Sequence, residues 1–253
     1  PLTDYFFNRA SVRRQSCVAV CEGDAGDFFA ACSGQRAVST IAAIALQSFG
    51  DDGGGKSVSM NLHSLFKTVS NGLPFLLLRL SPVGGEEAFV AISGGAVFGG
   101  KGNPAGTVTP DELEIIRLMY GCGHEGVLIL GAENPACFRV GDSACRVRCL
   151  VKDGRPRFEM SLETVLIPDF PGGATAGEET GREAQRELER RLEALAVKFR
   201  DEFGVPLPGL QSLLRQRQPD WYDRHSDEAE EICRAAEVTF DVRCSIVEGG
   251  IVK

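Results

Sequence analysis

The stretch that decides the fold is ACRVRCLVKDGRPRFEMSLETVL, residues 144–166. It contains two runs of alternating apolar and polar residues, 144–151 and 157–166, which is the period of a half-buried β-strand. Asp153-Gly154 lies between them, and Asp-Gly favours the type I′ turn of a tight hairpin. The sequence therefore predicts an antiparallel hairpin with one apolar face.

The residues that follow this hairpin predict a helical layer and a further strand. Apolar residues three to four apart run through residues 182–203, which indicates a long amphipathic helix, and Gly204 ends it. Shorter helices are expected at 209–217 and about 226–234. Residues 237–247 alternate again, and we expect a half-buried antiparallel strand there. The C-terminal part is thus predicted to be an antiparallel sheet covered by a long helix.

The segments before the hairpin mix helices and strands. We expect the end of a helix at 3–15, a strand at 16–21, a short helix capped by Asp24, and helices at 38–49 and 58–70 that are joined by a loop. Strands are predicted at 75–80, 88–98, 106–108 and 126–130, with a helix from 110 to about 120. Gly94 and Gly95 interrupt a strand, which indicates a bulge or a close approach of two strands. The pattern predicts an α+β fold with mixed or antiparallel sheets and packed helices. The predicted domains are a mostly helical 1–72, a small α/β domain 73–135, and 136–253.

Composition restricts the possible partners. The net charge is −8 and the pI about 5.1, which argues against binding the phosphate backbone of nucleic acids. No apolar run reaches the roughly 20 residues that span a bilayer. The nine cysteines form no CxxC pair and the three histidines are scattered, so we predict buried reduced thiols and no metal site. Because the chain begins at Pro1 without a Met, we expect it to be an N-terminally truncated form.

One motif suggests an enzyme. Residues Gly50–Ser57, GDDGGGKS, fit the phosphate-binding pattern GxxxxGK[ST]. Such a loop follows a buried strand, whereas the residues before Gly50 are predicted to be helical, and Asp51 and Asp52 would repel phosphates. We interpret the segment as a solvated loop and keep a P-loop NTPase as the alternative.

Other reactive arrangements are weaker still. His124 beside Glu125 has no further catalytic partner, and Ser16, Ser93 and Ser143 lack a nucleophile elbow. The acidic and basic residues of 178–193 interleave along the long helix, which is typical of a solvated, ion-paired face, with docking onto a partner as the alternative. Trp221 is expected to pack between the long helix and the last sheet, or else to line a small apolar pocket. We predict no catalytic, cofactor-binding or metal-binding residues.

Three stretches together resemble the Ger(x)C family, the C subunits of bacterial spore germinant receptors. They are LTDYFFNRASVRRQSCVAVCEGDAGDFF (2–29), GGAVFGGKGNPAGTVTPDELEIIRLMYG followed by GVLIL (94–130), and residues 183–250, where Pro219-x-Trp221 precedes EVTFDVRCSIVEGG. In the second stretch Val108 stands where the family's pattern has Leu, and Glu112 and Glu114 lie at the place of the pattern's Glu. The family's lipobox Cys and first strands have no counterpart here, and nine cysteines are more than the family usually has.

The resemblance implies a non-catalytic, extracytoplasmic subunit without cofactor. It would be lipid-anchored in the full-length protein on the outer face of the spore inner membrane, through an anchor absent from this chain. It would act through contacts with the membrane-embedded A and B subunits during nutrient-triggered germination, and we expect no nucleic-acid partner. A module that senses the germinant itself is a further alternative.

Overall fold

In a computed structural model, residues 16–32, 37–41, 60–84, 89–121, 126–130, 136–168 and 178–247 are described. The chain divides into two compact units, Pro1–Pro110 and Asp111–Lys253. The structure therefore has two units where three domains were predicted. Strands of one sheet pair across each of the two predicted boundaries, at 72–73 and at 135–136. The fold class itself, α+β with mixed sheets, is confirmed.

The first unit contains a five-stranded mixed sheet in the order β2-β1-β3-β4-β5. Its strands are β1 (Cys17–Cys21), β2 (Met60–Asn61), β3 (Phe75–Val83), β4 (Phe89–Phe98) and β5 (Pro104–Val108). β1 runs parallel to β3, while the other neighbours are antiparallel. The pairing of β1 with β3 crosses the boundary predicted at 72–73, so the residues on both sides belong to one sheet.

Gly94 produces the predicted irregularity in β4. Its φ is +117°, a conformation that side chains rarely adopt, and a Cβ at this position would overlap the carbonyl oxygen of Val108 on β5. The register between β3 and β4 shifts between Arg79 and Leu80, directly beside it. The prediction of a bulge with a close strand approach is therefore confirmed.

The helices of the first unit follow their capping residues. α2 (Ala25–Ala31) begins after Asp24, whose carboxylate accepts hydrogen bonds from the backbone N–H groups of Gly26 and Asp27. α4 (Leu62–Ser70) begins after Asn61 and ends at Asn71-Gly72, as predicted. The helix predicted over 58–70 is too long, because residues 60–61 pair with β1 as β2.

Several predicted segments of this unit lie wholly or partly outside the described residues. Residues 37–41 are helical, as expected for the start of the 38–49 helix, and its remainder lies outside. The expected helix at 3–15 and the loop at 50–57 also lie outside. Phe28, Cys32, Ala37 and Val90 form a buried apolar cluster, so α2 and the 37–41 helix share a core with β4.

The second unit contains a four-stranded sheet in the order β6-β7-β8-β9. Its strands are β6 (Val127–Leu130), β7 (Ala136–Lys152), β8 (Arg155–Pro168) and β9 (Glu237–Ile246). β7 and β8 form the predicted antiparallel hairpin, and Asp153 and Gly154 have φ of 52° and 76°, as a type I′ turn requires. β6 pairs with β7 across the boundary predicted at 135–136, so that boundary falls inside this sheet.

The prediction that the last strand is antiparallel is wrong. β9 runs parallel to β8, from Glu237 opposite Arg157 to Ile246 opposite Leu166. Alternation of apolar and polar residues indicates one buried face, but it contains no information on strand direction. The direction follows from the connection, because a strand that returns to the same sheet through helices can lie parallel to the strand before them.

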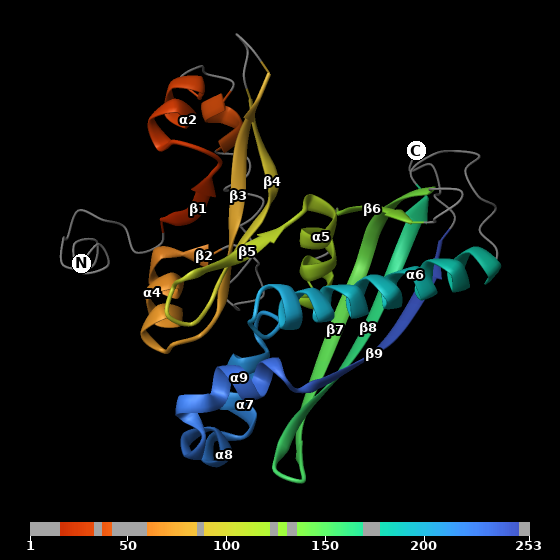
Figure 1. Cartoon of the computed structure of the whole chain (residues 1–253). Coiled ribbons are helices and arrows are strands. Elements are labelled where there is room, and N and C mark those ends of the chain that lie inside the picture. Colours follow the sequence, from red (N-terminus) through yellow and green to blue (C-terminus); the bar gives the residue numbers. More distant parts are fainter. Residues whose placement is uncertain are drawn as a thin grey trace. The chain divides into compact units, whose positions relative to one another are not determined.

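The long helix covers one face of this sheet. α6 (Glu178–Val197) packs across β9 and continues into one π-helical turn, η1 (Lys198–Glu202), before Gly204, whose φ is 68° (Figure 1). The predicted apolar stripe is buried: Leu188, Leu192, Leu195 and Phe199 are at most 3% exposed. The apolar residues of β8 are buried too, and they alternate with polar residues on the other face.

Shorter helices complete the second unit. α5 (Pro110–Met119) precedes β6, and α7 (Leu210–Arg217), α8 (Pro219–Arg224), η2 (Ser226–Glu228) and α9 (Ala229–Arg234) connect α6 with β9. α8 was not predicted. It begins with Pro219 in its first turn, a position where the missing N–H costs no intrahelical hydrogen bond. Among the described residues, no helix is long and apolar enough to cross a membrane.

Candidate docking surfaces

The candidate reactive residues of the sequence are not brought together in the described part of the chain. The P-loop-like segment Gly50–Ser57 and the pair His124-Glu125 lie outside it. Ser93 and Ser143 have buried hydroxyls without a hydrogen-bond partner in the structure. No group of three or more His, Cys, Asp or Glu side chains within the described ranges could hold a metal ion.

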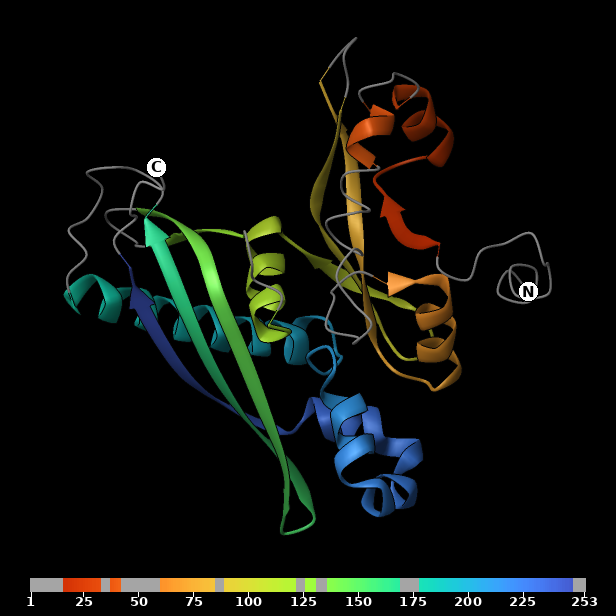
Figure 2. The same cartoon turned by 180° about the vertical axis from the view of Figure 1, so that it is seen from behind.

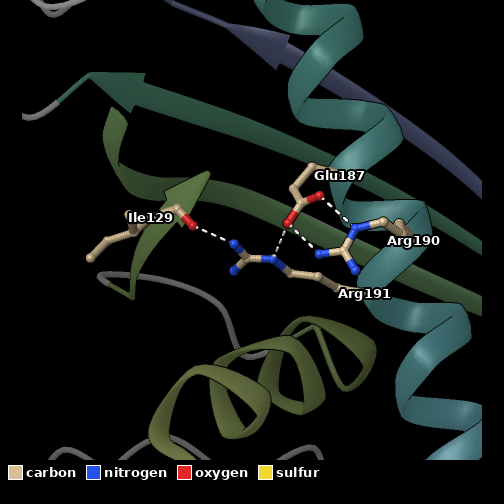
Figure 3. A network of polar contacts seen from close by, with 4 residues as sticks. All are labelled: Ile129, Glu187, Arg190 and Arg191. Atoms are coloured by element: carbon tan, nitrogen blue, oxygen red, sulfur yellow. Dashed lines mark hydrogen bonds and ion pairs between the residues drawn. The ribbon is translucent and has the colours of Figure 1, made fainter. Parts of the chain in front are cut away.

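The interleaved charges of α6 form an ion-pair network. The Glu187 carboxylate accepts hydrogen bonds from Arg190 at 2.8 Å and from Arg191 at 2.8 Å (Figure 3). Arg191 also donates to the backbone carbonyl of Ile129 in β6, at 2.7 Å. Because β6 is an edge strand, this bond satisfies one of its outward carbonyls and ties the edge of the sheet to the helix.

The same network sets the ionisation of Glu187. The hydrogen bond from Arg190 is the largest cause that lowers its pKa, and Arg191 adds to it; burial opposes both, and the resulting pKa is about 2. Glu187 is 15% exposed, whereas Arg190 is 66% exposed. Solvent therefore screens the ion pair between Glu187 and Arg190, and we assign this pair only a small contribution to the stability of the fold.

A groove of about 790 Å³ lies between α5 and α6. Lys198 bridges its two walls, since its ammonium group lies 2.8 and 2.9 Å from the two carboxylate oxygens of Glu112. Arg190 and Val197 stand at the groove and are strongly exposed. The walls thus combine fixed charges of both signs with exposed apolar surface, which suits a protein-binding surface better than a reacting centre.

Trp221 is buried, but in different surroundings from those predicted. It lies in α8 and stacks on the ring of His225 with 4.2 Å between centroids. His225 Nδ1 lies 2.8 Å from the backbone oxygen of Trp221. Nearby, the buried Gln211 side chain donates to the Tyr222 hydroxyl at 3.0 Å. The Gln211–Tyr222 hydrogen bond therefore joins α7 to α8, while the Trp221–His225 stack lies within α8 and its C-cap.

The described cysteines are free thiols. Burial raises the pKa of Cys145, Cys149 and Cys244 to about 11 and that of Cys233 to about 12. Since only the thiolate is a strong nucleophile, these groups are unreactive near neutral pH and act as small apolar side chains. The sequence interpretation of buried reduced thiols fits Cys32, Cys149 and Cys233, whereas Cys145 and Cys244 are half-buried and Cys17 is exposed.

Sequence reasoning missed one surface feature. The face of the β7–β8 hairpin opposite the buried one presents exposed cations, Arg146, Arg148, Lys152, Arg155 and Arg157. In the sequence, Arg146 and Arg148 indicate only that the strand alternates. The concentration of these cations within a chain of net charge −8 was the signal that could have identified the surface.

These features define an α+β protein whose described polar groups form surface ion pairs and exposed charged faces. The family profile described as "Spore germination B3/ GerAC like, C-terminal" matches residues 93–250, more than half of the chain. The chain therefore belongs to this GerAC-like family of spore germination proteins, and the resemblance to the Ger(x)C family is confirmed.

A solved structure extends the comparison of the fold beyond the matched region. The structure titled "Crystal Structure of the GerBC protein" superposes with a TM-score of 0.74 at 17% sequence identity. The superposition covers 97% of this chain and 73% of that chain. The fold of both units is therefore similar to that of GerBC. No curated protein matches the sequence.

Proposed function

We propose that this chain is a C-type subunit of a bacterial spore germinant receptor, which acts without catalysis through contacts with the membrane-embedded A and B subunits. The single observation that carries the proposal is the GerAC-like family match over residues 93–250. The likeness of the fold to GerBC over 97% of the chain supports it. In this proposal the full-length protein is held by a lipid anchor at the outer face of the spore inner membrane.

The α5–α6 groove is the surface that we propose for a partner subunit. Its cation–carboxylate bridge Lys198–Glu112 joins α5 to η1, the π-helical turn that continues α6, so the groove is preformed and little order is lost on binding. Arg190 presents an exposed guanidinium, and arginine is enriched among the hot-spot residues of protein–protein interfaces. Val197 provides adjacent apolar surface.

Co-purification tests the proposal. The chain would be produced together with the A and B subunits of its receptor in detergent, with an affinity tag on the A subunit. We expect the chain to elute with the tagged complex. Arg190→Glu should weaken the association, whereas Arg217→Glu, which reverses an exposed charge on α7, should not. If the tagged A and B subunits elute together but the chain does not elute with them, the proposed role is wrong.

The nucleotide-binding alternative has a separate test. Its segment, Gly50–Ser57, lies outside the described residues. Incubation with ATP and Mg²⁺ should give no hydrolysis that depends on Lys56. Hydrolysis that is lost in Lys56→Ala would favour an NTPase. A germinant-sensing role would instead appear as a rise in melting temperature when the nutrient is added.

A further inference from the structure

The outer face of the β7–β8 hairpin carries a group of cations towards its turn, with Glu159 opposite Arg148 and Glu237 opposite Arg157 on the same face. We name this surface the basic hairpin face and define it by Arg146, Arg148, Leu150, Lys152, Arg155 and Arg157. All six side chains are exposed, and Leu150 is 47% exposed. The strand register places them on one face, with Lys152 opposite Arg155 and Leu150 opposite Arg157.

Most of these cations lack a counterion. Arg157 forms an ion pair with Glu237 at 2.9 Å. Within the described part of the chain, Arg146, Arg148, Lys152 and Arg155 form no ion pair. Elsewhere in the same unit, Arg117, Arg190, Arg191 and Lys198 are each paired with a glutamate. A chain with an excess of acidic residues thus leaves a group of neighbouring cations unpaired.

The arrangement works against folding. Lys152 and Arg155 are directly opposite in the register, and like charges in that position destabilise a strand pair. Nothing in the hairpin turn needs them, because Asp153-Gly154 supplies the turn conformation. Within the β7–β8 register only Arg148 has an acidic residue, Glu159, directly opposite, so the cations nearest the turn are the ones available to a partner outside the chain.

The shape of the hairpin favours a planar partner. β9 begins opposite Arg157, so the residues of β7 and β8 nearer the turn extend beyond the start of β9. Figures 1 and 2 both show the closed end of the hairpin extending past the start of β9. A protein interface of high affinity needs an apolar core, and here Leu150 is a single apolar side chain among cations. An anionic lipid surface needs only positive charge and one or two apolar side chains that enter the headgroup region.

We propose that the basic hairpin face binds the surface of a bilayer that contains anionic phospholipids, with Leu150 at the headgroup level. The inference deepens the proposed function, since it concerns how the subunit lies at its membrane. It adds a contact made by the folded chain itself to the anchor proposed for the full-length protein. Its test uses lipids alone, so its failure would leave the co-purification result standing.

Vesicle co-sedimentation tests the proposal. The chain is mixed with vesicles of phosphatidylcholine alone or of phosphatidylcholine with phosphatidylglycerol. We expect binding only to the anionic vesicles, and we expect it to weaken as salt rises, because exposed charges are screened over about 10 Å at 0.1 M salt. Absence of binding to the anionic vesicles at low salt would overturn the proposal.

A pair of variants with equal net charge locates the contact. Arg148→Gln/Lys152→Gln/Arg155→Gln should reduce the partition onto anionic vesicles roughly 100-fold, since each basic residue contributes about fivefold. The control, Lys67→Gln/Lys101→Gln/Arg217→Gln, removes three exposed cations outside the hairpin and should bind like the wild type. Equal losses in the two variants would show a general charge effect and would overturn the proposal.

Two further readouts complete the test. Circular dichroism verifies that the hairpin variant is folded; if it is not, Arg146→Gln/Arg148→Gln, away from the turn, replaces it. Polyglutamate serves as a soluble acidic polypeptide. If the chain binds polyglutamate through the hairpin and does not bind anionic vesicles, the partner is an acidic protein, and the lipid proposal is wrong.

Discussion

The two faces of the β6–β9 sheet differ in what their residues do. The covered face consists of apolar side chains beneath α6, with Phe158 and Leu166 completely buried. The opposite face carries exposed charges, of which only some are paired. Alternate residues of the same strands therefore serve different purposes: one set stabilises the fold, while the other is available to a partner.

Phe158→Ala should produce the largest effect. Its side chain is 0% exposed, and truncation of a buried phenylalanine costs about 3–5 kcal/mol because it removes apolar burial and leaves a cavity. Glu159→Ala, one residue along on the exposed face, should change the free energy of unfolding by less than about 0.5 kcal/mol. Urea denaturation of both variants measures the difference. Similar losses would show that the two faces are not divided as described.

Removal of the Lys198–Glu112 bridge between α5 and η1 should have an intermediate effect on the free energy of unfolding. Lys198→Met leaves Glu112 without this partner in a half-buried position, and we expect a loss of about 1–2 kcal/mol. A double-mutant cycle with Glu112→Gln isolates the pairwise contribution. A coupling energy indistinguishable from zero would mean that the bridge does not hold the groove together.

Glu187 should make the free energy of unfolding depend on pH in the acid range. Its folded pKa of about 2 lies below the usual 4.5, so the ionised form stabilises the folded state. This contribution is complete above about pH 4.5 and is lost as the pH falls towards 2. Because Arg190 is largely exposed, we expect only about 1 kcal/mol. Unfolding measured from pH 6 to pH 2 should depend less on pH in Glu187→Gln, and identical profiles would contradict the assignment.

The exposed and buried cysteines should differ in their rate of reaction with a thiol reagent. Cys149 and Cys233 are buried with raised pKa values of about 11 and 12, so both are protonated at pH 8. Cys17 is exposed. Labelling of the folded protein with a thiol reagent, followed by mass spectrometry, should modify Cys17 well before the two buried thiols. Equal rates would indicate that the covered face opens readily.

Local chemistry allowed much of the fold to be predicted from the sequence. Asp153-Gly154 and the alternation around it determine the hairpin, Asp24 begins α2, and the apolar stripe of α6 faces the core. These features depend on residues close together in the chain. The family was also identified from the order and spacing of three sequence stretches, and the family match confirms it.

The remaining features depend on contacts that are distant in sequence. The parallel direction of β9 is set by the path of the connecting helices, and the pairing of β1 with β3 joins segments that composition had separated. α8 was missed because Pro219 was taken as a boundary, although proline is well tolerated in a first helical turn. The basic hairpin face required knowledge of which cations lack partners, which only the folded chain shows.

Lys152→Glu tests the central claim, that the outer face of the hairpin is used for binding and not for stability. The substitution places an acid opposite Arg155, so the free energy of unfolding should stay the same or rise by up to about 1 kcal/mol. In the same preparation, partition onto anionic vesicles should fall at least tenfold, since the charge changes by two. Unchanged vesicle binding, or a loss of binding explained by unfolding, would contradict the account.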